Sequence, residues 1–578
     1  MKGKYFSGTV LKKDITRFAP VWGLYTIFML LFLFVMWDAE RSRFAIIARS
    51  LMQMMGGLNL VYGGLVALFL FGDLFQSRMG NALHAMPLRR EGWFFSHITA
   101  GLLFSVVPNL LGAVLASLIM ENLAFLAYVW LGCATLSFVF YFAVAVFSCL
   151  CAGNRIGAVA VYGIVNFFAV IVSFFAKLFY EPLLYGVELD ISKYFNFSPV
   201  IALTQGDYVN VSYDYVTETV LFKGYGSQIW VYLFVAAGVG LVFGALALLL
   251  YRKRQLETAG DFVAVKAAAP VFLTIYSLGV GALLYAIGES MTSSAQYAFL
   301  LIGLALGFFT GKMLLERRVK VFSKKNFLGF ASLLAAFLVS LGITVLDPLG
   351  LETYVPKAES VESVTISPYS SYYYQNGNHT LYDEEDIEEI IRLHKLQISQ
   401  RTGGVTTFRI TYQMKNGTRV TRSYEIFYEG EVAQALKPIY SRPESVFGGK
   451  NAAGWALGAT RLEFYSYSER VPNVIVSAED ATMEELTEKF GDDKTYILKI
   501  NNGTVSGSEV VKGLLAAMEK DCLEGNMAQA WDYHQSDEHI GSLIIQGASV
   551  AANREILIWE SCRNTYNYLQ YLATQAAG

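Results

Sequence analysis

Charged side chains are scarce in this chain of 578 residues. They make up 16% of it, against about 25% in ordinary soluble domains. Several charge-free windows are about 20 residues long, enough to cross a hydrocarbon core of about 30 Å. The shortage of charge therefore indicates a membrane protein with many spans. The net charge of −3 gives no basic surface of the kind that binds nucleic acid.

Motifs for catalysis and for metal binding are also missing. The segment TGKM at 310–313 looks like the end of a phosphate-binding loop. However, Leu306 stands where the first glycine of that loop belongs, and Met313 replaces the Ser or Thr that holds Mg²⁺. No HExxH occurs, and no Ser, His and Asp gather at one membrane depth. We therefore expect no catalytic residue, metal site or cofactor on this chain, and we expect that it is not an enzyme.

Hydropathy predicts a polytopic α-helical membrane protein, with a transmembrane region over 18–347. The first apolar stretch runs into Trp37 and Asp38 without a small-residue cleavage site, so we expect it to remain as a span. The predicted spans are 18–37, 56–75, 98–120, 126–151, 157–180, 229–251, 269–289, 295–311 and 327–347.

The distribution of Lys and Arg predicts the orientation of these spans. With the N-terminus in the cytoplasm, the inside connections hold 19 basic residues and the outside ones hold 5. Residues 1–17 then form a cytoplasmic interfacial helix, although an ordinary basic flank of a span would give the same pattern. Nine spans leave the acidic loop 181–228 and everything after 347 outside the cell. One missed or surplus helix would reverse the location of the C-terminal region.

The C-terminal region, 348–578, has the pattern of a soluble α+β domain. Alternating residues flank Asn416-Gly417, which is a strong hairpin signal. The segment DEEDIEEIIRLHKL predicts a helix with Ile387, Ile390 and His394 on one face. Further helices are expected at 480–489, 508–521 and 564–575, and strands at 461–466, 495–500, 541–546 and 555–559. Cys522 and Cys562 either form a disulfide outside the cell or stay as two buried thiols.

Small and polar residues inside the spans indicate helix packing. Glycines recur at every fourth position, a pattern that lets two helices approach closely within one subunit or between two. Asn109 and Asn166 either line a substrate path or bond a neighbouring helix. The glycines in question are Gly240, Gly244, Gly303, Gly307 and Gly311.

A polar connection, 77–97, joins the second and third spans. It has about 20 residues where a handful would join the two spans. Pro87 fits the first turn of a helix, which would carry Arg89, Arg90, Trp93 and His97.

At this connection the sequence resembles ABC-2-type transporter permeases of Gram-positive bacteria. Those proteins carry a stretch similar to LHSLPIKRxxLFxSHxxAG. Here the residues read LHAMPLRR at 83–90, FFSH at 94–97 and AG at 100–101, with Ala85 in place of the Ser. NFSPVIAL at 196–203 and YRKRQLETAGDFVAV at 251–265 also resemble family segments, and the C-terminal region resembles an extracellular extension found on some members.

The resemblance implies that this connection is a coupling helix, which fits a groove on a separate ATPase subunit. The simpler alternative is that the basic residues of this connection serve only to orient the spans. The residues that the resemblance assigns to coupling are His84, Pro87, Arg89, Arg90, Trp93, Phe94 and His97.

The resemblance further implies a permease subunit in the cell membrane that exports peptide antibiotics, drugs or lipid-like molecules and contributes to antibiotic resistance. Its partners would be an ABC ATPase subunit, which holds the ATP and Mg²⁺, a second permease subunit, identical or different, and the lipid bilayer. The main alternative is a membrane-anchored sensor whose extracellular domain binds a ligand. Nine spans argue against the sensor because a passive sensor needs only one or two.

The predicted orientation is tested by a protease added to intact protoplasts. We expect cleavage within 348–578 and protection of the basic connections, measured by mass spectrometry of the released peptides. Protection of 348–578 until the membrane is lysed would contradict the count of nine spans.

Overall fold

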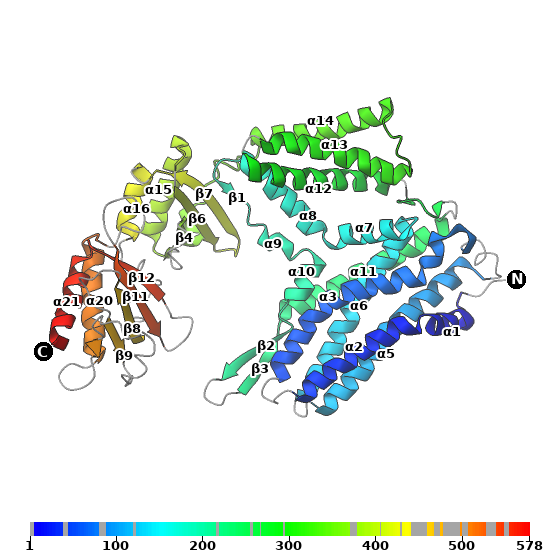
Figure 1. Cartoon of the computed structure of the whole chain (residues 1–578), viewed down its shortest axis with the longest axis horizontal. Coiled ribbons are helices and arrows are strands. Elements are labelled where there is room, and N and C mark those ends of the chain that lie inside the picture. Colours follow the sequence, from blue (N-terminus) through cyan, green and yellow to red (C-terminus); the bar gives the residue numbers. More distant parts are fainter. Residues whose placement is uncertain are drawn as a thin grey trace. The chain divides into compact units, whose positions relative to one another are not determined.

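The structure is a computed structural model in which the chain forms two compact units (Figure 1). The first comprises 1–180 and 190–342, and the second comprises 181–189 and 343–578. The structure describes residues 5–38, 44–79, 88–119, 123–214, 219–254, 258–265, 267–292, 295–369, 379–404, 406–427, 430–440, 459–466, 474–477, 498–499, 507–526, 539–547 and 554–577.

The first unit is helical, apart from one short hairpin. Its helices are α1 (Gly8–Arg17), α2 (Ala19–Asp38), α3 (Phe44–Leu70), α5 (Arg90–Ile119), α6 (Phe125–Cys151), α7 (Arg155–Asn166), α8 (Phe168–Phe175), α9 (Ser192–Phe195), α10 (Pro199–Gln205), α11 (Ser227–Lys253), α12 (Ala268–Met291), α13 (Ala295–Glu316) and α14 (Lys324–Val345). Short turns η2 (Gly72–Phe75) and η4 (Ala176–Tyr180) follow α3 and α8, and the hairpin pairs β2 (Val209–Asp214) with β3 (Thr219–Tyr225).

The expectation of a multi-pass membrane protein agrees with these helices. Within the described ranges, seven helices are long and apolar enough to cross a membrane, and the number rises to nine if each of two bent pairs is one span. The pairs are α1 with α2, bent by 63°, and α7 followed by α8, bent by 70°.

Two helix starts differ from the predicted spans. Helix α3 begins at Phe44 rather than 56, because Arg49 and Gln53 lowered the hydropathy of its first turns. Helix α5 begins at Arg90 rather than 98. The second half of the expected coupling connection is therefore the first two turns of a long apolar helix.

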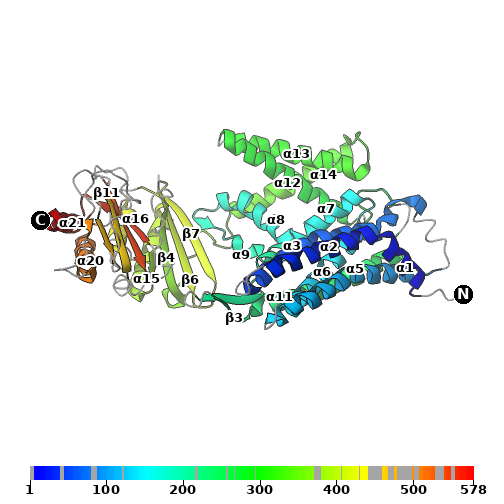
Figure 2. The same cartoon turned by 60° about the horizontal axis from the view of Figure 1, so that its bottom comes forward.

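Helix α6 is the centre of the first unit. It packs against α3, α5 and α11, and the figures show α2, α3, α5, α6 and α11 running alongside one another (Figures 1 and 2). In α6, 78% of the most apolar window is buried, compared with 6% in α14. Buried aromatic rings of Tyr62, Phe138 and Phe142 fill the space between α3 and α6.

The glycines of α13 face α12 of the same chain. A Cβ atom on Gly303 would lie 2.8 Å from the Cα of Gly281, and one on Gly307 would lie 2.7 Å from the Cα of Ser277. Gly311 packs on Leu273 in the same way, with 2.7 Å to its Cδ1 atom. The repeat therefore packs two helices within one subunit.

The two glycines of the pair in α11, Gly240 and Gly244, differ in their surroundings. A Cβ on Gly240 would lie 2.8 Å from the Cα of Phe140, so this glycine lets α11 approach α6. Gly244 has nothing within 4 Å of such an atom, so no close approach depends on it.

In its described residues, the second unit contains two five-stranded sheets and four helices. The first sheet has the order β1-β7-β6-β4-β5, and the second has the order β10-β9-β8-β11-β12. The strands are β1 (Val187–Glu188), β4 (Val361–Tyr369), β5 (His379–Leu381), β6 (Thr406–Met414), β7 (Arg419–Ile426), β8 (Ala459–Ser466), β9 (Val474–Ser477), β10 (Leu498–Lys499), β11 (His539–Gly547) and β12 (Arg554–Trp559). The helices are α15 (Glu384–Gln400), α16 (Glu431–Tyr440), α20 (Gly507–Leu523) and α21 (Arg563–Ala577).

Most elements expected after 347 are present in this unit. Strands β6 and β7 pair across Asn416-Gly417, where Gly417 has a φ of +82°. Helix α15 buries Ile387, Ile390 and His394 as its pattern indicates. The helix expected at 480–489 lies outside the described residues.

The structure contains no disulfide between Cys522 and Cys562. Both side chains are buried thiols, and the Sγ atom of Cys562 lies 3.6 Å from the carbonyl oxygen of Asn526, to which it donates.

The loop between α8 and α9 supplies an edge strand to the first sheet. Strand β1 pairs antiparallel with β7, with Val187 opposite Arg422. Gly186 precedes it with a φ of +69°, and a Cβ there would collide with the ring of Tyr424 at 1.8 Å. Arg409 Nε donates to Glu188 Oε2 at 2.7 Å. Residues 181–189 and the C-terminal region therefore lie on the same side of any membrane that the chain crosses.

We expect residues 181–189 to stabilise the C-terminal unit. A fragment 346–578 with this segment fused to its N-terminus through a flexible linker gains the contacts of Tyr185 and Glu188. Two side-chain hydrogen bonds contribute about 2 kcal/mol, which corresponds to a rise in Tm of about 4–8 °C for a unit of this size. Thermal unfolding followed by circular dichroism measures the rise.

The matched control carries Gly186→Val in the fused segment. This variant should lose the gain because the valine side chain meets the ring of Tyr424. Equal Tm values for the fused and unfused fragments would contradict the role of β1.

Candidate coupling site at one end of the helix bundle

Those residues assigned to coupling that the structure describes lie at the end of the bundle where α5 begins and α3, α6 and α11 end. His84 and Pro87 are outside the described residues. Arg89 precedes α5, while Trp93, Phe94 and His97 occupy its first two turns. We call the polar side chains gathered here the basal cluster: Asp14, Arg90, Glu91, His97, Arg252 and Arg254.

Arg254 holds the ends of two other elements from its place just after α11. Its side chain is buried. Nη1 donates to the carbonyls of Cys149 and Leu150 at 2.9 and 3.0 Å, and Nη2 donates to those of Ala152 at 2.9 Å and Leu74 at 3.4 Å. The last four carbonyls of a helix have no partner within the helix, and a cation there also interacts favourably with the helix dipole. Arg254 therefore caps α6 and ties it to the turn after α3.

Arg90 caps α11 in the same manner. Its Nη1 donates to the carbonyls of Arg252 and Arg254 at 3.0 and 2.9 Å. Glu91 adds a partly exposed ion pair with Arg252 at 3.1 Å. The guanidinium of Arg90 therefore bonds to its own chain, whereas the coupling assignment predicts that it faces a partner subunit.

Helix α1 is joined to α5 by buried polar contacts. Oδ2 of Asp14 lies 2.7 Å from Nδ1 of His97, and both side chains are buried. The backbone N–H of Ser7 donates to Ser96 Oγ at 3.0 Å. Arg89 contacts the segment before α1, with its guanidinium over the ring of Tyr5 at 4.6 Å. His97 is therefore a structural partner of Asp14.

Trp93 and Phe94 belong to the core of the first unit. Their exposed fractions are 3% and 4%. The ring of Phe94 packs on Phe71 and Tyr251, and that of Trp93 packs on His97. A residue that binds a partner subunit must be exposed in the free chain, so these two residues do not suit direct contact with the ATPase, to which the coupling assignment pointed. Phe95 is 40% exposed and lies in the same turn.

The connection between α11 and α12 closes the same end of the bundle. The N–H of Gly260 donates to the carbonyl of Gly153 at 2.6 Å, and that of Ala264 donates to Cys151 at 2.7 Å. A Cβ atom on Gly153 would lie 2.2 Å from the carbonyl oxygen of Thr258, so only glycine permits this approach. Residues 258–265, the later part of the segment that resembles a family segment, therefore pack against the end of α6.

Asn109 and Asn166, the two polar residues singled out inside the spans, make hydrogen bonds between and within helices. Tyr25 on α2 donates its hydroxyl to Asn109 Oδ1 at 3.0 Å, and Asn109 in turn donates to Ser105 at 3.1 Å. Asn166 is buried at the break between α7 and α8 and donates to the carbonyl of Tyr162 at 2.9 Å. For Asn109, these contacts favour a bond to a neighbouring helix over a place in a substrate path.

No group of His, Cys, Asp and Glu that could hold a metal ion occurs among the described residues. The most buried histidine, His394, lies in the second unit, with its ring nitrogens 3.0 and 2.7 Å from the hydroxyls of Tyr412 and Tyr424. Burial, helped by the nearby Arg422, lowers the pKa of His394 to about 3, so it stays neutral. It fills a hydrogen-bonded position in the core.

Neither a family model, nor a curated protein, nor a solved structure matches this chain.

Sequence reasoning missed Asp14 and Arg254. Arg254 had been counted only as one of the basic residues that orient the spans. Its position directly after an apolar helix, beside Arg252 and Lys253, was the available signal.

The capping role of Arg254 predicts a large loss of stability on substitution. Arg254→Gln leaves buried carbonyls without a charged donor, and we expect a cost of at least about 3 kcal/mol. Arg252→Gln is the matched control, because its ion pair is partly exposed and contributes about 1 kcal/mol or less. A thiol-reactive dye, which labels buried Cys149 only on unfolding, gives the thermal midpoint in detergent. Equal midpoints for the two variants would contradict the capping role.

Proposed function

We propose that the chain is the membrane-spanning permease subunit of an ABC transporter, driven by a separate ATPase subunit. The motif at 83–101 and the segment 251–265 support this proposal through their resemblance to ABC-2-type permeases. Among the described residues, the seven membrane-length helices, or nine spans if each bent pair is one span, agree with a transport domain.

The basal cluster is the observation that carries the proposal. The connection 77–97 ends in the first two turns of α5, which are tied to α1 by Asp14 and to α11 by Arg90. Arg254 extends the same network to α6 and to the turn after α3. A partner that pushes on this connection would therefore move five helix ends together, which is what the transmission of force requires.

The proposed location is the cell membrane, with the basal cluster in the cytoplasm and the second unit outside. The excess of Lys and Arg in the connections at this end supports the orientation. The pairing of β1 with β7 supports one location for the loop 181–189 and the C-terminal unit. Four membrane-length helices, α11 to α14, lie between the loop 181–189 and the first strand after 347, and an even number of crossings returns the chain to the same side.

The proposed activity is export of peptide antibiotics, drugs or lipid-like molecules, with a second permease subunit, identical or different, completing the transporter. ATP and Mg²⁺ would bind to the ATPase partner. The resemblance alone supports this substrate class.

The second candidate is a membrane-anchored sensor, and the β1 strand favours it. A ligand bound to the second unit would act directly on α8 through residues 181–189, which the first sheet holds. Purification from the native host separates the two functions: a transporter brings an ATPase subunit with it, and a sensor brings a kinase or no partner.

The coupling role predicts the effect of charge reversal in the connection. Arg78 and Arg89 both belong to the connection, and Arg78 is exposed. In the double variant Arg78→Glu/Arg89→Glu, repulsion replaces attraction to an acidic groove, and the loss of such pairs costs about 2–5 kcal/mol. We expect the amount of co-purified ATPase to fall more than tenfold.

The control is Lys320→Glu/Lys324→Glu, which changes the net charge equally at exposed positions outside the connection. It should retain the ATPase, as measured by quantitative mass spectrometry of the purified complex. Equal capture by both variants would overturn the assignment of the connection as the docking element.

A further inference from the structure

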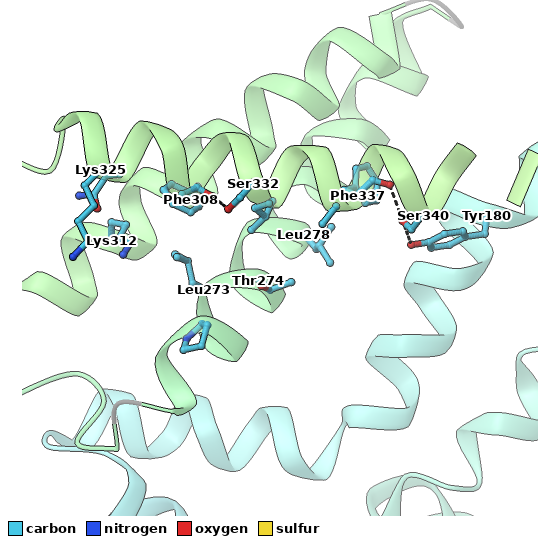
Figure 3. Close-up of a pocket in the computed structure, with 15 residues that line it drawn as sticks. Tyr180, Leu273, Thr274, Leu278, Phe308, Lys312, Lys325, Ser332, Phe337 and Ser340 are labelled. Carbon is cyan, nitrogen blue, oxygen red and sulfur yellow. Dashed lines mark hydrogen bonds between the residues drawn. The ribbon is translucent and has the colours of Figure 1, made fainter. Parts of the chain in front are cut away.

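A cavity of about 600 Å³ lies between α12, α13, α14 and the turn η4 (Figure 3). It follows α14 from Lys325 to Ser340, which is about 22 Å at the rise of an α-helix. The hydrocarbon core of a bilayer is about 30 Å thick. The cavity therefore runs through most of the depth that a membrane-spanning helix crosses.

One end of the cavity is cationic. Lys312 on α13 and Lys325 on α14 line it together, as Figure 3 shows. No Asp or Glu is among the lining residues. Glu316, close to this end, accepts hydrogen bonds from Arg318 at 2.8 and 2.5 Å and from the cavity-lining Asn326 at 3.4 Å. The two ammonium groups thus present positive charge to whatever enters this end.

The walls beyond the lysines are mainly apolar. Leu273 and Leu278 line one side, and Phe308, Leu333 and Phe337 line the other. The hydroxyls at the far end satisfy each other, because Tyr180 Oη and Ser340 Oγ lie 2.9 Å apart (Figure 3). Polarity therefore changes along the cavity from two cations to hydrocarbon.

The cavity borders on apolar helix surface that the rest of the structure leaves uncovered. Only 6% of the most apolar window of α14 is buried within the structure, and exposed side chains on this helix include Leu328 and Leu338. A membrane lipid can therefore reach the cavity sideways from the bilayer.

We propose that this cavity binds one anionic phospholipid, with its phosphate between Lys312 and Lys325 and an acyl chain along the apolar walls. The charge at one end and the hydrocarbon lining match the two parts of such a molecule. The headgroup would lie at the end where α13 finishes and α14 begins, at the depth at which Lys side chains meet lipid phosphates. The site does not depend on the proposed transport function.

The experiment is native mass spectrometry of the full-length protein in detergent micelles that contain dioleoyl-phosphatidylglycerol or dioleoyl-phosphatidylcholine. We expect a one-lipid adduct that forms preferentially with phosphatidylglycerol. Lys312→Gln/Lys325→Gln should weaken that adduct roughly 30-fold, since each lysine near an anionic headgroup contributes about 1 kcal/mol. Lys320→Gln/Lys324→Gln removes the same charge from exposed positions next to the site and should leave the adduct unchanged.

A second variant tests the place of the acyl chain. Ala336 lines the cavity, so Ala336→Phe should fill it and abolish the adduct while both lysines remain. Equal adducts with the two lipids, equal effects of the two lysine pairs, or an adduct that survives Ala336→Phe would each overturn the proposal. Displacement of the lipid by inorganic phosphate alone would also overturn it, because that would identify a site for a free anion. None of these outcomes involves an ATPase, so the proposed function is tested separately.

Discussion

The burial of one guanidinium, that of Arg254, organises the end of the bundle to which we assign coupling. Helix ends leave carbonyls unsatisfied, and in a packed membrane domain little water is available to satisfy them. Arg254 donates to four such carbonyls, and its own backbone carbonyl accepts from Arg90. One side chain thereby fixes where α3 and α6 finish relative to α11, and α5 is fixed by the same chain of contacts.

The membrane part was predictable because lipid restricts a spanning segment to a long apolar helix. The hairpin at Asn416-Gly417 was equally predictable, since its signal lies within four residues. The capping role of Arg254 was not predictable, because the sequence does not reveal which carbonyls a long side chain will reach. Similarly, Asp14 and His97 are 83 residues apart. Trp93 and Phe94 suited an interface by composition, but the same aromatic pair suits a core, and only the packing distinguishes the two.

The strand β1 illustrates a second limit of sequence patterns. It has two residues, too few for any alternation to be recognised, and its partner lies far along the chain. Its effect on the architecture is nevertheless large. It links the segment that leaves η4 to the sheet that follows α14, so two connections of the helical unit lead into a single sheet. The domain boundary drawn at 348 from composition alone therefore left out part of the C-terminal unit.

This arrangement also sets the order of events during biosynthesis. Glu188 precedes its partner Arg409 by 221 residues. At a synthesis rate of about 5–20 residues per second, Arg409 is synthesised roughly 10–45 s after Glu188, so strand β1 has no partner strand during that time. In the proposed membrane topology, the four helices α11 to α14 insert during that interval, and the first sheet is completed only when the last of its strands has reached the same side of the membrane. Assembly of this sheet is therefore a late step, and it requires that the helices between β1 and β4 have returned the chain to the side where β1 lies.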